Sequence, residues 1–447
     1  MQGIIENSAE SSPVKPNLME LNIEKVSSDG SGIARSDGGV VFVSGALPGE
    51  TVEAEITKRK KDFALARVAR VKKPHPHRIT PACTVFGSCG GCQLQHASYE
   101  LQLEIKADIL RDALSRIGGF DLREGELSRI ECVPSPQEWG YRNKASFPIR
   151  RIKGKPAAGF YQAGSHRLVQ LTSCPVNAAP LNRLFALVQN ELPNLSLDVY
   201  DEREHRGALR HLILRAGLHT KETLVSLVIN GRLNTAKMKS LTGLCRTLKE
   251  ATTVTLNHNS RPGNVILGER TEALRGTGLI TELLDEWTLR YDTTSFFQVN
   301  TEQSTRLYRH VQDLARGSES VLELYSGVGS LTGYLSNAKT VTSVEEWGNA
   351  VELMKENLKN NDITNITPLC GKAEEVMIGL NGGYDLVVPD PPRSGCERVV
   401  LEKMLEFGPE RILYVSCNPA TLARDAKILS EGNCGVKYKL KSVRAFD

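Results

Sequence analysis

Cys417 is the residue whose surroundings best suit covalent chemistry. It follows an apolar segment, residues 411–415, that predicts a β-strand, and it stands in the run Ser416-Cys417-Asn418-Pro419 just before a predicted helix. A helix N-terminus stabilises a thiolate, which is the nucleophilic form of cysteine. A single cysteine is more often a small buried hydrophobic residue, and Cys396 is a rival nucleophile. The place of Cys417 at a strand tip nevertheless favours it as the nucleophile.

Two other strand ends point to a nucleoside cofactor. Residues 321–325 run into Ser326-Gly327-Val328-Gly329, and a Gly-x-Gly turn lets a ligand approach the backbone closely. The next predicted strand ends at Glu345, about 18 residues beyond Gly327, where a carboxylate can accept hydrogen bonds from both ribose hydroxyls. The third glycine of a dinucleotide fingerprint is not at its expected spacing, which favours S-adenosylmethionine.

Polar groups also follow the strand predicted over residues 385–389. The prolines of Asp390-Pro391-Pro392-Arg393 fix a non-helical exit, so the Asp390 carboxylate can bond a base edge or orient the methyl donor. Gln298 and Asn300 offer amides at the start of another predicted helix, although Asn300 also suits a simple N-cap. Because ligands bind at the carboxyl ends of strands in an open parallel sheet, we expect these groups and Cys417 to meet in one crevice.

This combination predicts methyl transfer to a pyrimidine. C5 of uracil is a poor nucleophile until a group adds at C6, and a thiolate can make that addition. The enolate that results can attack a methyl sulfonium. A thiol beside a nucleoside-binding turn therefore indicates a methyltransferase acting on uracil.

Three cysteines, Cys83, Cys89 and Cys92, lie within ten residues, with two glycines before the last of them. Such a group is hard to explain as core packing and predicts a metal centre. A fourth ligand is required, and Cys174 is preferred to Cys132 because a proline follows it. The spacing favours an iron–sulfur cluster over the alternative, a structural zinc ion.

The order of predicted elements indicates an α/β protein with three parts. From residue 291 strands alternate with helices, which is typical of a doubly wound, Rossmann-like sheet. Residues 19–71 predict short strands of a small OB-like β-barrel, and the part between them is β-rich. A helix over residues 98–117 has an apolar stripe and is expected to pack on the catalytic domain. The predicted divisions are a loose tail (1–15), an RNA-binding barrel (16–74), a central β-rich domain with the cluster (75–285) and a catalytic domain (286–447).

Composition and charge indicate which partners and which cellular compartment to expect. The chain has 56 Lys and Arg against 52 Asp and Glu, but nine basic residues and one acid fall between Lys58 and Arg78, which suits a phosphate backbone. Arg210 and His211, at the start of a predicted strand, are weaker candidates for RNA contact. No secretory signal or membrane-spanning run is present, and ten cysteines are too few for a disulfide scaffold. We expect a cytoplasmic protein with no membrane contact and no obligate protein partner.

Several motifs together resemble known families. Gly30-Ser31-Gly32-Ile33-Ala34 and the segment 45–50 resemble the TRAM domain, a small RNA-binding barrel. The cysteine group, the Asp390–Arg393 turn and the Ser416–Pro419 turn, with Phe297-Gln298-Val299-Asn300, resemble bacterial RNA uracil-5 methyltransferases that carry a TRAM domain.

The resemblance implies a residue-by-residue assignment. The product is 5-methyluridine, most often in 23S ribosomal RNA, with transfer RNA as the alternative, and Cys417 is the nucleophile. A [4Fe–4S] cluster is expected, and S-adenosylmethionine is expected beside the Gly-x-Gly turn. The implied cluster ligands are Cys83, Cys89, Cys92 and Cys174, and the implied cofactor-site residues are Gln298, Tyr325, Gly327, Gly329, Ser330, Glu345 and Asp390.

The sequence departs from the family pattern at three places. Ser330 replaces an amide, and Lys372 stands where an acid or amide often meets the adenine. The chain stops at residues 444–447, where the family's tail with its general-base Glu begins. This implies an alternative, an RNA-binding protein whose turnover is impaired and whose covalent adduct with RNA persists.

Overall fold

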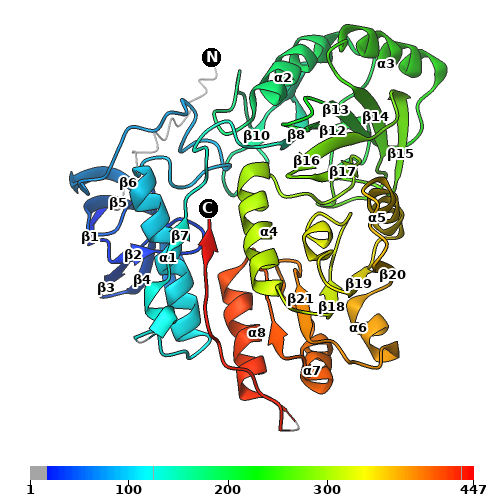
Figure 1. Ribbon diagram of the computed structural model, residues 1–447. Coiled ribbons are helices and arrows are strands. Elements are labelled where there is room, and N and C mark those ends of the chain that lie inside the picture. The colour runs from blue at the N-terminus through cyan, green and yellow to red at the C-terminus, as the bar shows by residue number, and fades with distance from the viewer. Residues whose placement is uncertain (1–17, 124, 434) are drawn as a thin grey trace, which may run out of the picture. The chain divides into compact units, whose positions relative to one another are not determined.

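The computed structural model describes residues 18–123, 125–433 and 435–447 (Figure 1). The tail predicted over residues 1–15 lies outside these ranges. The chain forms two compact units, one made of the residues up to Pro81 together with Cys92–Ile105, and the other of Ala82–Gly91 and Lys106–Asp447.

The first unit contains a six-stranded sheet with the order β1-β5-β6-β4-β3-β2. Its neighbours pair antiparallel except for β4 and β6, which are parallel. Alternate residues of β5 and β6 point into a small apolar core, as the period of two in the sequence requires. The strands are β1 (Leu18–Asn22), β2 (Lys25–Val26), β3 (Gly32–Ser36), β4 (Gly39–Ser44), β5 (Thr51–Arg59) and β6 (Phe63–Lys73).

The second unit begins with a six-stranded mixed sheet, order β15-β14-β13-β12-β8-β9. Strands β12 and β13 are buried along their whole length, including the polar residues Arg210, His211 and Arg215 of β12. Helices α2 (Ala179–Glu191) and α3 (Thr235–Thr247) contribute to the same core. The strands are β8 (Lys144–Ile152), β9 (Lys155–Ala158), β12 (Leu209–Ala216), β13 (Thr223–Ile229), β14 (Thr253–His258) and β15 (Arg270–Arg275).

A five-stranded parallel sheet with the order β20-β19-β18-β21-β22 follows. Figure 1 shows α7 and α8 beside its strands β18 and β21. The strands are β18 (Ser320–Leu324), β19 (Thr340–Glu345), β20 (Ile366–Cys370), β21 (Leu386–Pro389) and β22 (Arg411–Ile412). The helices are α4 (Thr301–Ala315), α5 (Gly348–Asn360), α6 (Ala373–Val376), α7 (Arg398–Phe407) and α8 (Pro419–Glu431).

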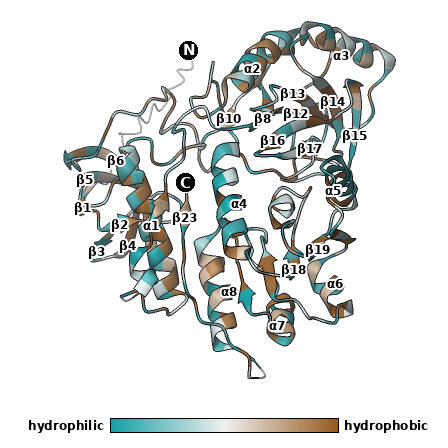
Figure 2. Cartoon of the chain, viewed as in Figure 1, coloured by the Kyte–Doolittle hydropathy of each residue, from teal (hydrophilic) through white to brown (hydrophobic). Residues whose placement is uncertain are grey.

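Helix α4 differs from an ordinary amphipathic helix in its first turns. It is coloured mostly as hydrophilic in Figure 2, and its buried N-terminal residues are polar. Thr301 accepts a hydrogen bond from the Asn143 amide at 2.9 Å, and the Gln303 amide donates to the Val133 carbonyl at 2.7 Å. These bonds satisfy buried polar groups and fix the start of α4 against the central sheet.

Helix α1 (Tyr99–Arg116) carries the apolar stripe predicted for residues 98–117. Leu110, Ala113 and Leu114 share a core with Ala423 of α8. The last described strand, β23 (Ala445–Phe446), pairs in parallel with β7 (Cys132–Val133). The second half of α1 therefore supports the helix that follows Cys417.

The remaining elements are short. They are the strand pairs β10 (Phe160–Tyr161) with β11 (Leu168–Val169) and β16 (Ile280–Leu284) with β17 (Trp287–Tyr291), and 3₁₀ turns at Gly125–Arg129, Leu192–Asn194, Thr332–Leu335 and Met377–Gly379.

Candidate active site

The turn after β18 has the backbone of a ligand-binding loop. Tyr325 adopts φ 65°, a left-handed conformation that costs a non-glycine residue about 1–3 kcal/mol. Gly327 and Gly329 adopt φ 58° and 91°. A Cβ at Gly329 would lie 3.0 Å from Met354, whereas one at Gly327 would meet no atom within 4 Å. The loop is thus closely packed beneath Gly329 and open above Gly327.

Glu345, at the end of β19, is joined to this turn. One of its carboxylate oxygens accepts from the Gly327 amide at 2.8 Å, and the other accepts from the Trp347 amide at 2.9 Å. The carboxylate is therefore held in one orientation, and each oxygen keeps a further lone pair. The Trp347 side chain is 64% exposed beside it. A fixed carboxylate next to an exposed aromatic ring suits a nucleoside.

Asp390 follows the neighbouring strand, β21. Its amide donates to the Leu324 carbonyl at 3.2 Å, which joins the two strand ends. Burial raises the pKa of Asp390 from 3.8 to about 6. The carboxylate therefore gains or loses its proton at a pH close to that at which most enzymes work.

Cys417 lies on the loop between β22 and α8. Although β22 ends at Ile412, the Leu413 and Val415 amides continue its hydrogen bonds to the β21 side at 3.0 and 2.9 Å. The thiol of Cys417 is exposed. Asn418 caps α8 by accepting from the Ala420 amide at 3.1 Å.

The loops that carry Asp390 and Cys417 are tied together. The Asn418 amide donates to the Arg393 carbonyl at 2.9 Å, and the Thr421 hydroxyl donates to the same carbonyl at 3.3 Å. Cys396, in contrast, is buried, and its burial raises the pKa of its thiol to about 12. Of these two cysteines, only Cys417 offers an accessible thiol.

Gln298 lies in the segment before α4. Its carbonyl accepts from the Asn143 amide at 2.8 Å, and the next residue, Val299, accepts from the Asn143 backbone at 2.9 Å. The half-buried Gln298 side chain forms no hydrogen bond within the described part of the chain. Phe297 is buried, whereas the Phe296 ring is 67% exposed. The segment is fixed by its backbone and leaves an amide and an aromatic ring available.

Ser330, which we predict at the cofactor site, has a partner in the protein. Its hydroxyl lies 3.2 Å from that of Tyr308, which is buried. Burial raises the pKa of Tyr308 above its ordinary value. Ser330 therefore links the glycine turn to α4.

Sequence reasoning missed one titratable group near these loops. Glu323, in β18, is buried, and its Oε2 accepts from the Thr332 and Ser343 hydroxyls at 2.7 Å each. Its Oε1 has no partner among the described residues, and burial raises its pKa to about 7. The sequence signal that could have revealed Glu323 is an acidic residue between the apolar residues of a predicted strand.

The prediction that Arg210 and His211 contact RNA is wrong. Both side chains are buried in β12. Arg210 donates to the carbonyls of Asn259 and Arg261 at 2.6 and 2.8 Å, and its guanidinium lies 4.5 Å from the centre of the Tyr200 ring. They stabilise the central sheet instead.

Comparison with known proteins places this geometry in a family. The family model for tRNA (uracil-5-)-methyltransferase matches residues 98–437, and the TRAM domain model matches residues 18–69. The chain belongs to the tRNA (uracil-5-)-methyltransferase family.

RNA methyltransferases from several bacteria are similar to this chain over nearly their full length. An uncharacterised RNA methyltransferase of Gloeobacter violaceus is 39% identical, over 97% of this chain and 95% of that protein. An uncharacterised RNA methyltransferase of Halalkalibacterium halodurans is 35% identical, over 98% of this chain and 96% of that protein. The predicted class, an RNA uracil-C5 methyltransferase that uses S-adenosylmethionine, is confirmed.

A solved structure has the same architecture. The Pyrococcus abyssi tRNA (uracil-54, C5)-methyltransferase, in complex with S-adenosyl-L-homocysteine, aligns with a TM-score of 0.75 and 27% identity, over 96% of each chain. The predicted fold class, with a TRAM barrel and a C-terminal methyltransferase fold, is confirmed.

The predicted cysteine centre of this uracil-5-methyltransferase stays a prediction. Cys83, Cys89 and Cys174 belong to one compact unit and Cys92 to the other. The described residues include no group of three or more His, Cys, Asp or Glu side chains placed to hold a metal ion. The backbone of Cys174 is nevertheless clamped, because the Asn182 amide accepts from its N–H and donates to its carbonyl, both at 3.0 Å.

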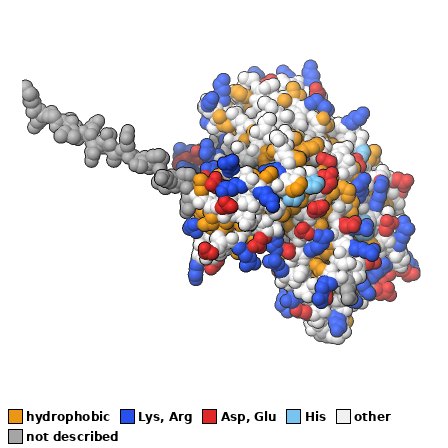
Figure 3. Space-filling model, turned by 90° about the vertical axis from the view of Figure 1, so that its left-hand side faces the viewer, with side chains coloured by type: hydrophobic (Ala, Val, Ile, Leu, Met, Phe, Trp, Pro, Cys, Tyr) orange, Lys and Arg blue, Asp and Glu red, His pale blue; other side chains and the backbone are white. Residues whose placement is uncertain are grey.

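The predicted basic segment of the TRAM barrel lies at the turn between β5 and β6. The side chains of residues 58–61 are exposed, and none forms an ion pair within the described ranges. Lys60 lies 5.7 Å from the centre of the Phe63 ring. On the face that Figure 3 shows, Lys and Arg side chains are interspersed with Asp and Glu.

No helix among the described residues is long and apolar enough to span a membrane.

Proposed function

We propose that this protein methylates C5 of a uridine in RNA and that Cys417 is the nucleophile. The observation that carries this proposal is the exposed Cys417 thiol on a loop hydrogen-bonded to the loop after Asp390. The buried Cys396 offers no comparable group. Both loops follow strands of the parallel sheet, where ligands bind in this class of fold.

The proposed reaction begins with addition of the Cys417 sulfur to C6 of uracil. The electron pair of the C5–C6 double bond moves to give an enolate that is nucleophilic at C5. S-adenosylmethionine, when bound, supplies the methyl group. Loss of the C5 proton to a base and elimination of the thiolate then restore the double bond and free the enzyme.

Residues around the glycine turn fit the methyl donor. The space above Gly327, the fixed Glu345 carboxylate and the unpaired Gln298 amide suit a nucleoside and an amino-acid group. The Asp390 carboxylate is assigned one of two roles: it accepts a hydrogen bond from the edge of the base, or it orients the methyl donor. The full proposed set is Gln298, Tyr325, Gly327, Gly329, Ser330, Glu345 and Asp390.

We assign RNA binding to the barrel, residues 16–74, with residues 75–285 as a central domain and residues 286–447 as the catalytic domain. The lysines and arginine at residues 58–61 have no ion pair with any described residue, and they suit phosphate contacts, which are independent of RNA sequence. We favour 23S ribosomal RNA as the target. The structural relative acts on uracil-54 of transfer RNA, so transfer RNA is the other candidate.

A [4Fe–4S] cluster bound by Cys83, Cys89, Cys92 and Cys174 is a second part of the proposal. Its support is the cysteine spacing and the clamp on the Cys174 backbone. Anaerobic purification, iron and sulfide analysis and visible absorption test it. Loss of iron in Cys174→Ala but not in Cys245→Ala is expected, and an iron-free wild-type protein would contradict it.

A substrate analogue tests the nucleophile directly. RNA in which 5-fluorouridine replaces uridine has no C5 proton to lose, so the covalent adduct is expected to persist on denaturing electrophoresis. The persistent adduct should form only when S-adenosylmethionine is present, because it is the methylated intermediate that cannot lose fluorine. It should be absent with the Cys417→Ala variant. An adduct of equal yield with that variant would exclude Cys417 as the nucleophile.

The target is identified by mapping 5-methyluridine. Total RNA from cells that lack the gene is incubated with the full chain and S-adenosylmethionine, and each RNA class is digested and analysed by mass spectrometry. New 5-methyluridine in 23S ribosomal RNA is expected, and its appearance in transfer RNA alone would correct the target.

A further inference from the structure

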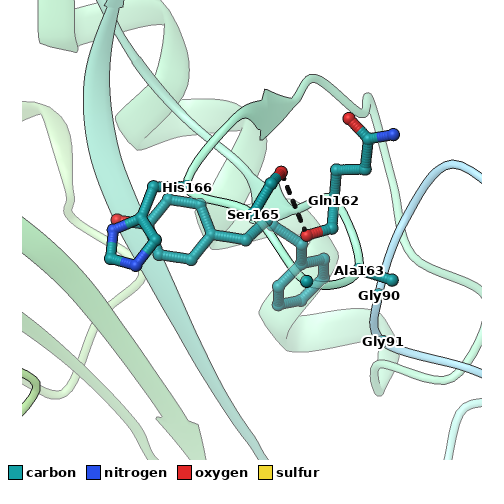
Figure 4. Close-up of a pocket in the computed structure, with 9 residues that line it drawn as sticks. Gly90, Gly91, Gln162, Ala163, Ser165 and His166 are labelled. Carbon is teal, nitrogen blue, oxygen red and sulfur yellow. Dashed lines mark hydrogen bonds between the residues drawn. The ribbon is translucent and has the colours of Figure 1, made fainter. Parts of the chain in front are cut away.

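An open pocket of about 490 Å³ lies between Gly90–Gly91 and the β10–β11 hairpin (Figure 4). None of its residues belongs to the loops that follow the strands of the methyltransferase sheet. Its size lies in the range of small-molecule sites and is sufficient for a nucleobase with part of its sugar. Gly90 and Gly91 line one side of the pocket, and Tyr161, Gln162, Ser165 and His166 line another.

The backbone on the two sides of the pocket is joined. The Gly90 amide donates to the Tyr161 carbonyl at 2.9 Å, and Cys89 and Gln162 form an antiparallel bridge. A Cβ at Gly90 would lie 3.1 Å from backbone atoms of Ala163 and Tyr161. A side chain at position 90 would therefore crowd this backbone. This side of the pocket presents backbone rather than side chains, which leaves room for a flat ligand.

Aromatic side chains line another side of the pocket. The Tyr161 and His166 rings are stacked, with centroids 5.1 Å apart and an angle of 28° between their planes. Arg150 donates to the Tyr161 hydroxyl and to Glu202, and Glu202 lies 2.9 Å from Nδ1 of His166. The stack is thus fixed before any ligand arrives, so binding on it loses little side-chain entropy.

Polar groups at the pocket remain available. Within the described ranges, the exposed side-chain amide of Gln162 and Nε2 of His166 form no hydrogen bond, while the Ser165 hydroxyl donates to the backbone carbonyl of Gln162 at 3.4 Å (Figure 4). An amide offers both a donor and an acceptor to the edge of a base. Arg167 follows directly, is exposed and has no ion pair with any described residue, so a phosphate can approach it.

We propose that this pocket binds one unstacked nucleobase of the RNA substrate, distinct from the uracil that is methylated. The Tyr161 ring is already covered by His166 and by the Arg150 guanidinium, 5.4 Å from its centre, so the base stacks on the exposed outer face of His166. Every base has a π-face for this contact, and the Gln162 side chain contacts its edge. This second contact point fixes the RNA relative to the central domain. The inference rests on the proposed function, because it takes RNA as the ligand.

Cross-linking tests the contact in the wild-type full chain. Total RNA from cells that lack the gene is irradiated with the protein and digested, and peptides carrying a nucleotide are mapped by mass spectrometry. A nucleotide adduct is expected on the tryptic peptide that ends at Arg167. This readout does not depend on methyl transfer, so it remains interpretable if the proposed reaction is wrong.

Two exposed residues supply the kinetic test. His166→Ala and Gln162→Ala are expected to raise KM for RNA, together roughly five- to a hundredfold, with kcat and KM for S-adenosylmethionine unchanged. Gln170→Ala, an exposed glutamine of the same region outside the pocket, is the control and should behave as wild type.

Unchanged KM for RNA in both variants, with no adduct on that peptide, would overturn the inference even in an active enzyme. A protein that binds RNA through this peptide but forms no 5-methyluridine would instead sustain the inference and refute the proposed reaction. Absence of RNA binding by the wild-type chain would overturn both.

Discussion

The strand-end loops of the methyltransferase sheet and the basic turn of the TRAM barrel differ in how their charged groups are held. At the sheet, Glu345 is bonded through both oxygens, Glu323 is buried, Asp390 is half-buried, and the pKa values of Glu323 and Asp390 are raised. At the barrel, the four basic side chains of residues 58–61 are exposed and form no ion pair among the described residues.

This difference follows from the two tasks. Methyl transfer requires reacting atoms in one geometry, so the groups near them are fixed and partly desolvated. Phosphate binding relies on charge and on counterion release, which tolerate many geometries. Substitutions at the sheet should therefore change rates, whereas those at the barrel should change affinity and its salt dependence.

The largest effect is expected for Cys417→Ser. An alcohol is a far weaker nucleophile than a thiolate, so methylation should fall by at least about a thousandfold while RNA affinity stays within about twofold. Transfer of a radiolabelled methyl group to RNA, alongside filter binding of the same RNA, measures both.

Cys396→Ser is the matched control for that substitution. Because Cys396 is buried beside the Tyr414 hydroxyl, the serine should keep most of the activity and lose a little stability. Equal loss of activity in the two variants would contradict the assignment of separate roles.

Asp390→Asn should lower kcat/KM by roughly ten- to a hundredfold, because a hydrogen bond to a charged group contributes about 1.5–3 kcal/mol. The pH profile sharpens this test. Below about pH 6 the Asp390 carboxylate gains a proton, so wild-type activity should fall as the pH drops through that value. The variant should lack that decrease, and an unchanged profile would show that Asp390 does not need its charge.

Much of the fold could be predicted from the sequence. The strand ends near Tyr325, Glu345 and Asp390 were visible because strands buried on both faces give apolar runs bounded by polar turns. The helix stripe of α1 was equally clear. These features depend on local periodicity, which a single sequence records.

What the sequence did not show depends on contacts between distant segments. Arg210 and Arg215 look like surface charges, yet both are buried, with partners about 50 to 80 residues away. The raised pKa of Glu323 results from burial between Thr332 and Ser343 on other elements. Spacing along the chain does not report such environments.

Replacing residues 58–61 by alanine should weaken RNA binding roughly ten- to a hundredfold near 0.1 M salt and leave kcat unchanged. Each lost phosphate contact should also reduce the slope of log K against log salt by about 0.7–0.9. Titrations at several salt concentrations measure that slope. Lys72→Ala removes a lysine that is already paired with Glu20, so it should change this slope less than the fourfold variant does. An unchanged slope in the fourfold variant would place the phosphate contacts elsewhere.

The smallest effect is expected for Glu323→Gln and appears in stability. Its pKa is about 7 in the folded protein against 4.5 ordinarily, so between these values the folded chain holds a proton that the unfolded chain has released. The free energy of unfolding should therefore fall as the pH rises through this window, by roughly 1–2 kcal/mol from pH 5 to pH 7. Glu323→Gln should lack that fall, whereas Glu319→Gln, at an exposed acid just before the same strand, should retain it. Denaturant titrations at pH 5, 6 and 7 measure the difference, and parallel curves for all three proteins would show that Glu323 is ionised in the fold.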